Sequence, residues 1–252
     1  MASEKTDGIV IRMVEFSETS LIVTLFTRVF GRVSAIAKGA RRPKGPFEGA
    51  IDLLGICHCE LLHKSNDSLD ILTEAKLARR FRGAQKTLPR LYCGYYIAEM
   101  LNRWTNDDDP HPDLYDLSVA TIERIDGTGD PIMAVTYFDA RALRMLGHSP
   151  ATSACVTCGD AVDRSPARVA FGYEQGGVLC VRCRSTHQGV AMIQSSTLAW
   201  LDRLTEAPEI PQERFDDATY RPIRALLNRY ITISLGVRPR TQSMLPTRVA
   251  VE

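Results

Sequence analysis

The sequence predicts a multidomain α+β protein: a five-stranded N-terminal barrel, then a helical domain that contains an inserted four-cysteine module. Three observations support this fold class. Short apolar runs separated by turn residues fill residues 7–77, and the apolar spacing becomes helical between residues 81 and 147. Two Cys-x-x-Cys pairs then interrupt the helical half. The expected domains are the barrel at 1–80, the helical domain at 81–150 and 187–252, and the cysteine module at 151–186.

The bulk composition is that of an ordinary globular chain. Its 252 residues are 44% hydrophobic and 24% charged, and the formal net charge is +1. A nucleic-acid partner must therefore be argued from local charge. No apolar segment follows the first residues, and no run approaches the ~18 apolar residues of a membrane helix, so neither a signal peptide nor a membrane span is expected. Seven cysteines, with Cys57, Cys59 and Cys93 in apolar runs, favour a reducing cytoplasm over disulfides.

Five segments of the barrel region have the length and alternation of strands. Turn composition at residues 17–20 and 64–68 separates neighbouring strands, and residues 39–49 contain too much glycine and proline for regular structure. Five short strands favour a barrel, because closing the sheet removes its exposed edges, and the OB-fold is the five-stranded candidate. The expected strands are 8–14, 21–27, 32–37, 51–63 and 69–77.

A run of cations without an acid follows the second expected strand. Residues 38–47 form a basic loop whose glycines let the backbone approach a partner. Phosphate contact is the functional interpretation, and a solvated loop kept basic for solubility is the alternative. An OB-fold, which often binds single strands, favours the first. Phe30 and Phe47 offer base-stacking rings, although Phe47 could equally be core and a core position is favoured for Phe30. The expected DNA-binding cations are Arg28, Arg32, Lys38, Arg41, Arg42 and Lys44.

The helical period predicts three helices, near residues 88–104, 114–125 and 131–147. Asp130 is the expected N-cap of the third helix, with Pro131 at its first position and Gly147 at its C-terminal end. Three consecutive acids at residues 107–109 resemble a metal cluster. Consecutive carboxylates in a loop point in different directions, so we interpret them as a solvated turn.

The paired cysteines predict a structural zinc site. Four thiolates satisfy a tetrahedral ion, and Gly159 and Gly176 permit the turns that bring each pair to it. Two disulfides or two redox-active pairs are the alternatives, but a redox pair would need one Cys-x-x-Cys at a helix start after a strand. Four thiolates leave no coordination position for water, which disfavours a zinc hydrolase. The expected ligands are Cys155, Cys158, Cys180 and Cys183.

The C-terminal part predicts two more helices, at residues 195–204 and 218–235. Six arginines and no acid lie between residues 218 and 251, a region that could meet DNA or the acidic tail of a partner. A helix C-terminus with favourable dipole placement is the alternative. The expected partner-binding residues are Arg221, Arg224, Ile223 and Leu227. No nucleophile, metalloprotease or phosphate-loop pattern occurs, so no catalytic residue is expected.

Several stretches together resemble the RecO family of recombination mediator proteins. The basic loop at residues 37–43 is a close match, and the similarity covers nearly the whole chain. Small departures include Phe16, where a tyrosine is common, residues 19–20, which lack an acid often found there, and residues 171–173, which replace a serine-proline sequence. The remaining similar stretches are 6–12, 16–28, 31–33, 137–150, 176–180 and 235–241.

The resemblance implies a non-enzymatic DNA repair protein of the cytoplasm, associated with the nucleoid. Such proteins bind single- and double-stranded DNA, anneal complementary strands, and help RecA to displace SSB together with a RecR partner. Some members lack the zinc cysteines, so the resemblance implies that zinc is not the source of the activity. The second hypothesis is an adaptor that docks the acidic SSB tail on the arginine-rich helix, with only incidental DNA contact.

Overall fold

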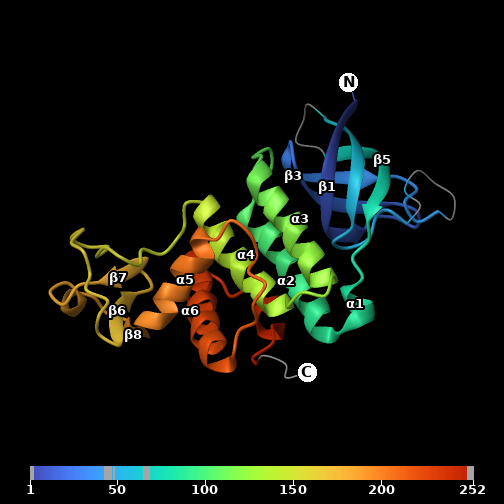
Figure 1. Ribbon diagram of the computed structural model, residues 1–252. Coiled ribbons are helices and arrows are strands. Elements are labelled where there is room, and N and C mark those ends of the chain that lie inside the picture. The colour runs from blue at the N-terminus through green and yellow to red at the C-terminus, as the bar shows by residue number, and fades with distance from the viewer. Residues whose placement is uncertain (1–2, 43–46, 48, 65–68, 249–252) are drawn as a thin grey trace. The chain divides into compact units, whose positions relative to one another are not determined.

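The chain divides into two units, Met1–Gly129 and Asp130–Glu252. The computed structural model describes residues 3–42, 47, 49–64 and 69–248 (Figure 1). Each unit is described by itself below. The expected division into a barrel, a split helical domain and a cysteine module stays a prediction.

Five strands of the N-terminal unit form a barrel. They close in the order β1-β2-β3-β5-β4, in which β3 and β5 are parallel and the other neighbours antiparallel. In Figure 1 these are the blue-to-teal strands. The five-stranded N-terminal architecture expected from the sequence is therefore confirmed. The strands are β1 (Ser3–Glu15), β2 (Leu21–Thr27), β3 (Gly31–Ala37), β4 (Ile56–Leu62) and β5 (Asp70–Arg79).

Alternating side chains fill the barrel interior. In β3 every second residue is buried, and Val33 and Ala35 lie opposite Leu25 and Val23 of β2. The expected strand at 51–63 was wrong at its start. Residues 51–55 form turns, in which Leu54 has a φ of 63° and the Gly55 amide donates to Asp52 O at 2.9 Å, so pairing begins only at Ile56.

The cysteines of the barrel behave as small core residues. Burial raises the pKa of Cys57 to about 11 and that of Cys59 to about 12, so both thiols stay protonated at neutral pH. Cys93 is also fully buried, and the described cysteines form no disulfide. The expectation that these three residues pack as hydrophobes is confirmed.

Three helices complete the N-terminal unit: α1 (Gly83–Lys86), α2 (Leu88–Trp104) and α3 (Pro112–Asp126). The Thr87 hydroxyl caps α2 by accepting from the Arg90 amide, and Pro89 occupies the first turn, where no donor is needed. Residues 93, 97, 100 and 101 of α2 are buried, so its inward face follows the helical spacing of the sequence.

The loop between α2 and α3 is held against the β2–β3 turn. The Arg32 amide donates to Asn106 O at 3.3 Å, and Gly31 bridges to Asp107. Gly31 has a φ of 70°, and a Cβ built on it would lie 2.4 Å from the carbonyl oxygen of Asp109. The interpretation of residues 107–109 as a merely solvated turn was therefore incomplete, because sequence-distant contacts bind this turn to the barrel.

We expect Gly31→Ala to lower the unfolding free energy of the N-terminal unit by about 1–3 kcal/mol. The new methyl group would strain a left-handed φ and displace the docked loop backbone. The measurement is equilibrium denaturation. Gly39→Ala is the matched control, since Gly39 has a similar φ of 75° but its nearest neighbour, Arg42 Cδ, is 3.5 Å away. Equal stability losses in the two variants would show that the docked loop contributes nothing.

Three helices and a small sheet make up the C-terminal unit. The sheet order is β7-β6-β8, and all its pairings are antiparallel. Asp130 caps α4 by accepting from the Ile132 amide at 3.0 Å, and Gly147 follows that helix with a φ of 74°, as the sequence predicts. The elements are α4 (Pro131–Met145), β6 (Arg168–Gly172), β7 (Gly177–Leu179), η1 (Arg184–Thr186), β8 (Val190–Gln194), α5 (Ser195–Glu206), α6 (Asp217–Leu235) and η2 (Thr241–Met244).

Helix α6 forms much of the core of this unit. The Arg224 guanidinium lies 2.7 Å from the Asp139 carboxylate of α4, and both side chains are almost completely buried. Tyr230 stacks edgewise on Phe171 of β6 at 6.3 Å and donates to His148 O at 3.0 Å. The sheet and the helices of this unit are thus joined through α6. In the part of the chain that the structure describes, no helix has the length and apolar character to cross a membrane.

Candidate metal centre and nucleic-acid interface

The four cysteines of the paired motifs meet at one point. The sulfurs of Cys155, Cys158, Cys180 and Cys183 all lie within 4.8 Å of one another, and those of Cys158 and Cys180 are 3.8 Å apart. A tetrahedral zinc with bonds of about 2.3 Å has sulfur–sulfur edges of about 3.8 Å. The donor set therefore fits a zinc ion in both chemistry and spacing. Among the described residues this is the one group of at least three potential ligands.

Local backbone hydrogen bonds build the two halves of the cluster. The Gly159 amide donates to Cys155 O at 2.8 Å, and Gly159 has a φ of 77°, which closes the first tight turn. The Arg184 amide donates to Cys180 O at 3.0 Å and closes the second. The Val156 amide donates to Val178 O at 3.1 Å and joins the two turns. This short-range geometry explains why the Cys-x-x-Cys spacing alone was informative.

Hydrogen bonds within the cluster lower the pKa of two of its thiols and raise that of the other two. Burial opposes ionisation of Cys155, but hydrogen bonds from the amides of Cys180, Cys158 and Thr157 outweigh it and lower its pKa to about 6. Amide donation from Cys183 lowers the pKa of Cys180. Hydrogen bonding to Cys180 raises the pKa of Cys183 to about 12. Metal binding requires thiolates, so zinc would displace the protons that these sulfurs carry.

Two of the six expected DNA-binding cations donate hydrogen bonds to carboxylates of their own unit. Arg28 donates from Nε and Nη2 to both oxygens of Asp116 on α3, at 3.0 and 2.9 Å, and these hydrogen bonds lower the pKa of Asp116. Arg32 donates to Asp107 Oδ1 and to Asn102 O, both at 2.7 Å. These arginines tie the barrel to α2 and α3, so a phosphate would have to compete with existing hydrogen bonds.

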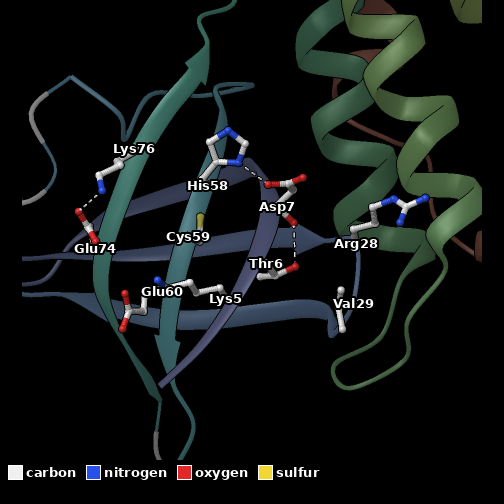
Figure 2. Close-up of a pocket in the computed structure, with 10 residues that line it drawn as sticks. All are labelled: Lys5, Thr6, Asp7, Arg28, Val29, His58, Cys59, Glu60, Glu74 and Lys76. Atoms are coloured by element: carbon white, nitrogen blue, oxygen red, sulfur yellow. Dashed lines mark hydrogen bonds and ion pairs between the residues drawn. The ribbon is translucent and has the colours of Figure 1, made fainter. Parts of the chain in front are cut away.

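A pocket of about 490 Å³ on the barrel surface beside Arg28 has balanced charge. Figure 2 shows that His58 and Asp7 point toward each other, as do Lys76 and Glu74. These pairs are 2.5 Å and 3.0 Å apart. Acids and bases from β1, β4 and β5 offset each other here, so the pocket offers no net attraction for phosphate. Its lining residues are Lys5, Thr6, Asp7, Arg28, Val29, His58, Cys59, Glu60, Glu74 and Lys76.

The expected basic loop leaves the end of β3, and its described cations Lys38, Arg41 and Arg42 are exposed. Its backbone is anchored, since the Arg41 amide donates to Thr19 O at 3.1 Å and the Arg42 amide donates to Gly39 O at 3.0 Å. Arg41 also lies 3.3 Å from the Glu15 carboxylate. Lys38 and Arg42 are exposed and form no ion pair within the part of the chain that the structure describes. Lys44 lies outside the described residues.

Both aromatic residues considered for base stacking pack against the barrel core. Phe47 is 4% exposed, so of the two alternatives left open for it the structure supports the core position. Phe30 packs against the same core and contacts His63 edgewise at 4.8 Å, which agrees with the core position favoured for it. Phe16 was noted in the sequence only as a departure from a common tyrosine, yet it is 59% exposed in the turn after β1. Its sequence signals are its place between a strand and the turn residues 17–20 and the aromatic residue common at this position in the resembled family.

Most of the expected partner-binding residues lie in the core. Ile223 and Leu227 are completely buried, and Arg224 is 5% exposed. Residues 220, 223, 224 and 227 share one helical face, and that face is the buried one. Arg221 alone of the four expected residues is exposed. In this structure the other three are not accessible to a partner, because Arg224 is ion-paired to Asp139 and the two apolar side chains pack inside the unit.

The family models and the relatives that match this chain carry the same family description along nearly its whole length. The family model described as "Recombination protein O N terminal" matches residues 1–81, and "Recombination protein O C terminal" matches residues 85–243. A DNA repair protein RecO of Rhodopirellula baltica is 45% identical, over 96% of this chain and 98% of that protein. The protein of the same name from Anaeromyxobacter dehalogenans (strain 2CP-1) is 33% identical over 94% of both chains. That from Syntrophus aciditrophicus is 28% identical over 97% of this chain and 95% of its own.

Proposed function

The chain belongs to the RecO family of DNA repair proteins, and on this basis we propose that it is a mediator that binds DNA through the basic loop of an OB-fold barrel. The observation that carries the proposal is the exposure of Lys38 and Arg42 without ion-paired partners among the described residues. Cations without a carboxylate partner can neutralise phosphate and release counterions, which favours binding to any nucleic acid.

Binding to the phosphate backbone of DNA is compatible with strand annealing. Contacts to phosphate position a strand but read no sequence, and they leave base edges free to pair with a complementary strand. We therefore propose that the protein anneals complementary single strands and assists RecA loading on SSB-coated DNA together with RecR. No catalytic step is part of this proposal. It rests on family membership and on the exposed loop.

We also propose that the protein binds one structural zinc ion. Cys155, Cys158, Cys180 and Cys183 would hold the ion, and four thiolates leave no position for a water nucleophile. When bound, zinc would supply folding energy to the module around it. An adaptor that docks an SSB tail on α6 is less well supported, because α6 exposes only Arg221 of the four residues expected to form that surface.

The test compares free and ion-paired cations. We expect the Lys38→Ala/Arg42→Ala variant to bind single-stranded DNA about tenfold more weakly near 0.1 M salt. The slope of log affinity against log salt should fall in magnitude by about 1.4, or ~0.7 per lost phosphate contact on a single strand. The measurement is fluorescence anisotropy across a salt series.

Arg28→Ala is the matched control, because it removes a cation that Asp116 already holds. Its salt slope should stay close to that of the unmodified protein. Unchanged affinity and unchanged slope in the Lys38/Arg42 variant, with its fold intact, would reject the loop as the DNA site. A larger slope change in Arg28→Ala would move the site to the β2–β3 turn.

A further inference from the structure

We propose that Phe16 is a base-stacking residue that makes the barrel's basic loop selective for unpaired nucleotides. The inference rests on the proposed DNA-binding function and adds a named contact and a substrate class to it. Phe16 is 59% exposed, and Met13 and Val14 of β1 are exposed on the strand that leads to it. A single exposed aromatic residue is common on protein surfaces and means little. Its position relative to the cations is what distinguishes this one.

Strand register places Phe16 and the basic loop at the same end of the barrel. Glu15 of β1 pairs with Leu21 of β2, and Leu21 pairs with Ala37 of β3. Phe16 follows Glu15 directly, and Lys38 follows Ala37 directly. Because paired strands lie about 4.8 Å apart, the two segments leave the sheet about 10 Å from each other. That span is comparable to the distance between a base and a neighbouring phosphate of one strand.

Hydrogen bonds fix both segments and hold them together. The Phe16 and Ser17 amides donate to Ser20 O at 3.1 and 3.3 Å, so the turn that carries the ring is closed. The Arg41 amide donates to Thr19 O at 3.1 Å and connects the basic loop to the same turn. A ring on an ordered turn loses little conformational freedom when a base stacks on it. The turn that carries the Phe16 ring is therefore formed before a DNA strand binds.

The charges near the Phe16 ring favour a nucleic acid as its binding partner. Lys38, Arg41 and Arg42 are exposed within the connected loop. Two acids belong to the same end of the barrel: Glu15, which lies 3.3 Å from Arg41, and the exposed Glu18. Glu15 partly neutralises Arg41, so phosphate binding is centred on Lys38 and Arg42. An aromatic face beside free cations is the combination used by proteins that bind single strands.

Stacking on Phe16 requires an accessible base face. In a duplex both faces of each base are covered by neighbouring pairs, so the ring can add affinity only for single strands. The basic loop, by contrast, reaches phosphates of either form. Every base has a π-face, so this contact distinguishes single from double strands without reading sequence.

The experiment uses the full-length protein with Phe16→Ala and Phe16→Leu and three probes of equal length. The probes are a single-stranded oligonucleotide, the same strand with abasic sites throughout its central half, and the duplex. We expect both variants to bind the single strand about 5- to 150-fold more weakly, the range expected for one base–aromatic stack. Affinity for the abasic strand and the duplex should stay within about twofold, and the salt slope should not change. Phe16→Trp should retain affinity, with indole fluorescence quenched by the single strand only.

The outcomes separate this inference from the proposed function. If Phe16→Ala binds the single strand normally while Lys38→Ala/Arg42→Ala does not, the stacking role is overturned and loop binding stands. Equal losses on all three probes would also overturn it, because a structural effect would explain them. Unmodified protein that binds none of the probes would overturn both proposals. Normal DNA binding by Phe16→Ala, combined with loss of a protein partner, would reassign the ring to protein docking.

Discussion

Replacing Cys155 with serine is expected to abolish stoichiometric zinc binding and to unfold the module between α4 and α5. Zinc binding in small thiolate sites is worth about 10–16 kcal/mol at neutral pH, and that energy is largely folding energy. The buried cluster around the sulfurs is small. It contains Cys155, Ala170 and Leu179, and two of the residues packed against it are further cysteines of the expected site.

Elemental analysis should find about one zinc ion per unmodified chain and almost none in Cys155→Ser. Limited proteolysis should then cut residues 151–194 in the variant at low protease concentration. Cys93→Ala is the control, because this buried thiol of α2 lies outside the cluster and its loss should leave the zinc content unchanged. Full zinc content in Cys155→Ser would refute the four-thiolate site. DNA binding through the barrel should survive in this variant, which separates structural zinc from activity.

Asp139→Ala is expected to destabilise the C-terminal unit by about 3–5 kcal/mol. The carboxylate lies 2.7 Å from Arg224, and both side chains are nearly inaccessible to water. Removing one partner leaves an arginine charge buried without that carboxylate, and desolvating such a charge is far more costly than losing an exposed ion pair. The measurement is the midpoint of denaturant unfolding, followed by a signal from this unit such as Trp200 fluorescence.

A double variant provides the control for this prediction. Asp139→Leu/Arg224→Met replaces both charges with apolar groups and should recover most of the stability lost in Asp139→Ala, because no unpaired charge remains. A loss below about 1 kcal/mol in Asp139→Ala would show that the pair behaves as a solvated one. In that case Arg224 would again be a candidate for the partner surface expected from the sequence.

Much of the fold could be predicted because it depends on local patterns. The alternation of β3, the helical spacing of α2 and the Asp130 cap each involve residues a few positions apart. The predicted strand ends were less accurate. The segment 51–55 has strand-like composition, yet the hydrogen bond between Gly55 and Asp52 turns it away from the sheet. Turn geometry outweighed apolar content there.

The candidate DNA surface was predicted only in outline. The described cations of the basic loop, Lys38, Arg41 and Arg42, are exposed, but Arg28 and Arg32 are engaged by carboxylates 88 and 75 positions away. The sequence also left open whether Phe47 is buried and did not indicate the exposure of Phe16, because both depend on contacts between distant segments. The barrel closes over one ring, while the other lies beyond the last paired residue of β1.

By itself, the sequence determined the pairing of the four cysteines, the five strands of the barrel, the main helices and the family, since these depend on spacings and motifs read along the chain. Only the tertiary structure decided which charged and aromatic side chains are free. It left Lys38, Arg42 and Phe16 accessible, and it placed Arg224, Ile223 and Leu227 in a core. The physical reason is that burial and ion pairing depend on residues brought together from distant parts of the chain, and residue type alone does not specify those partners.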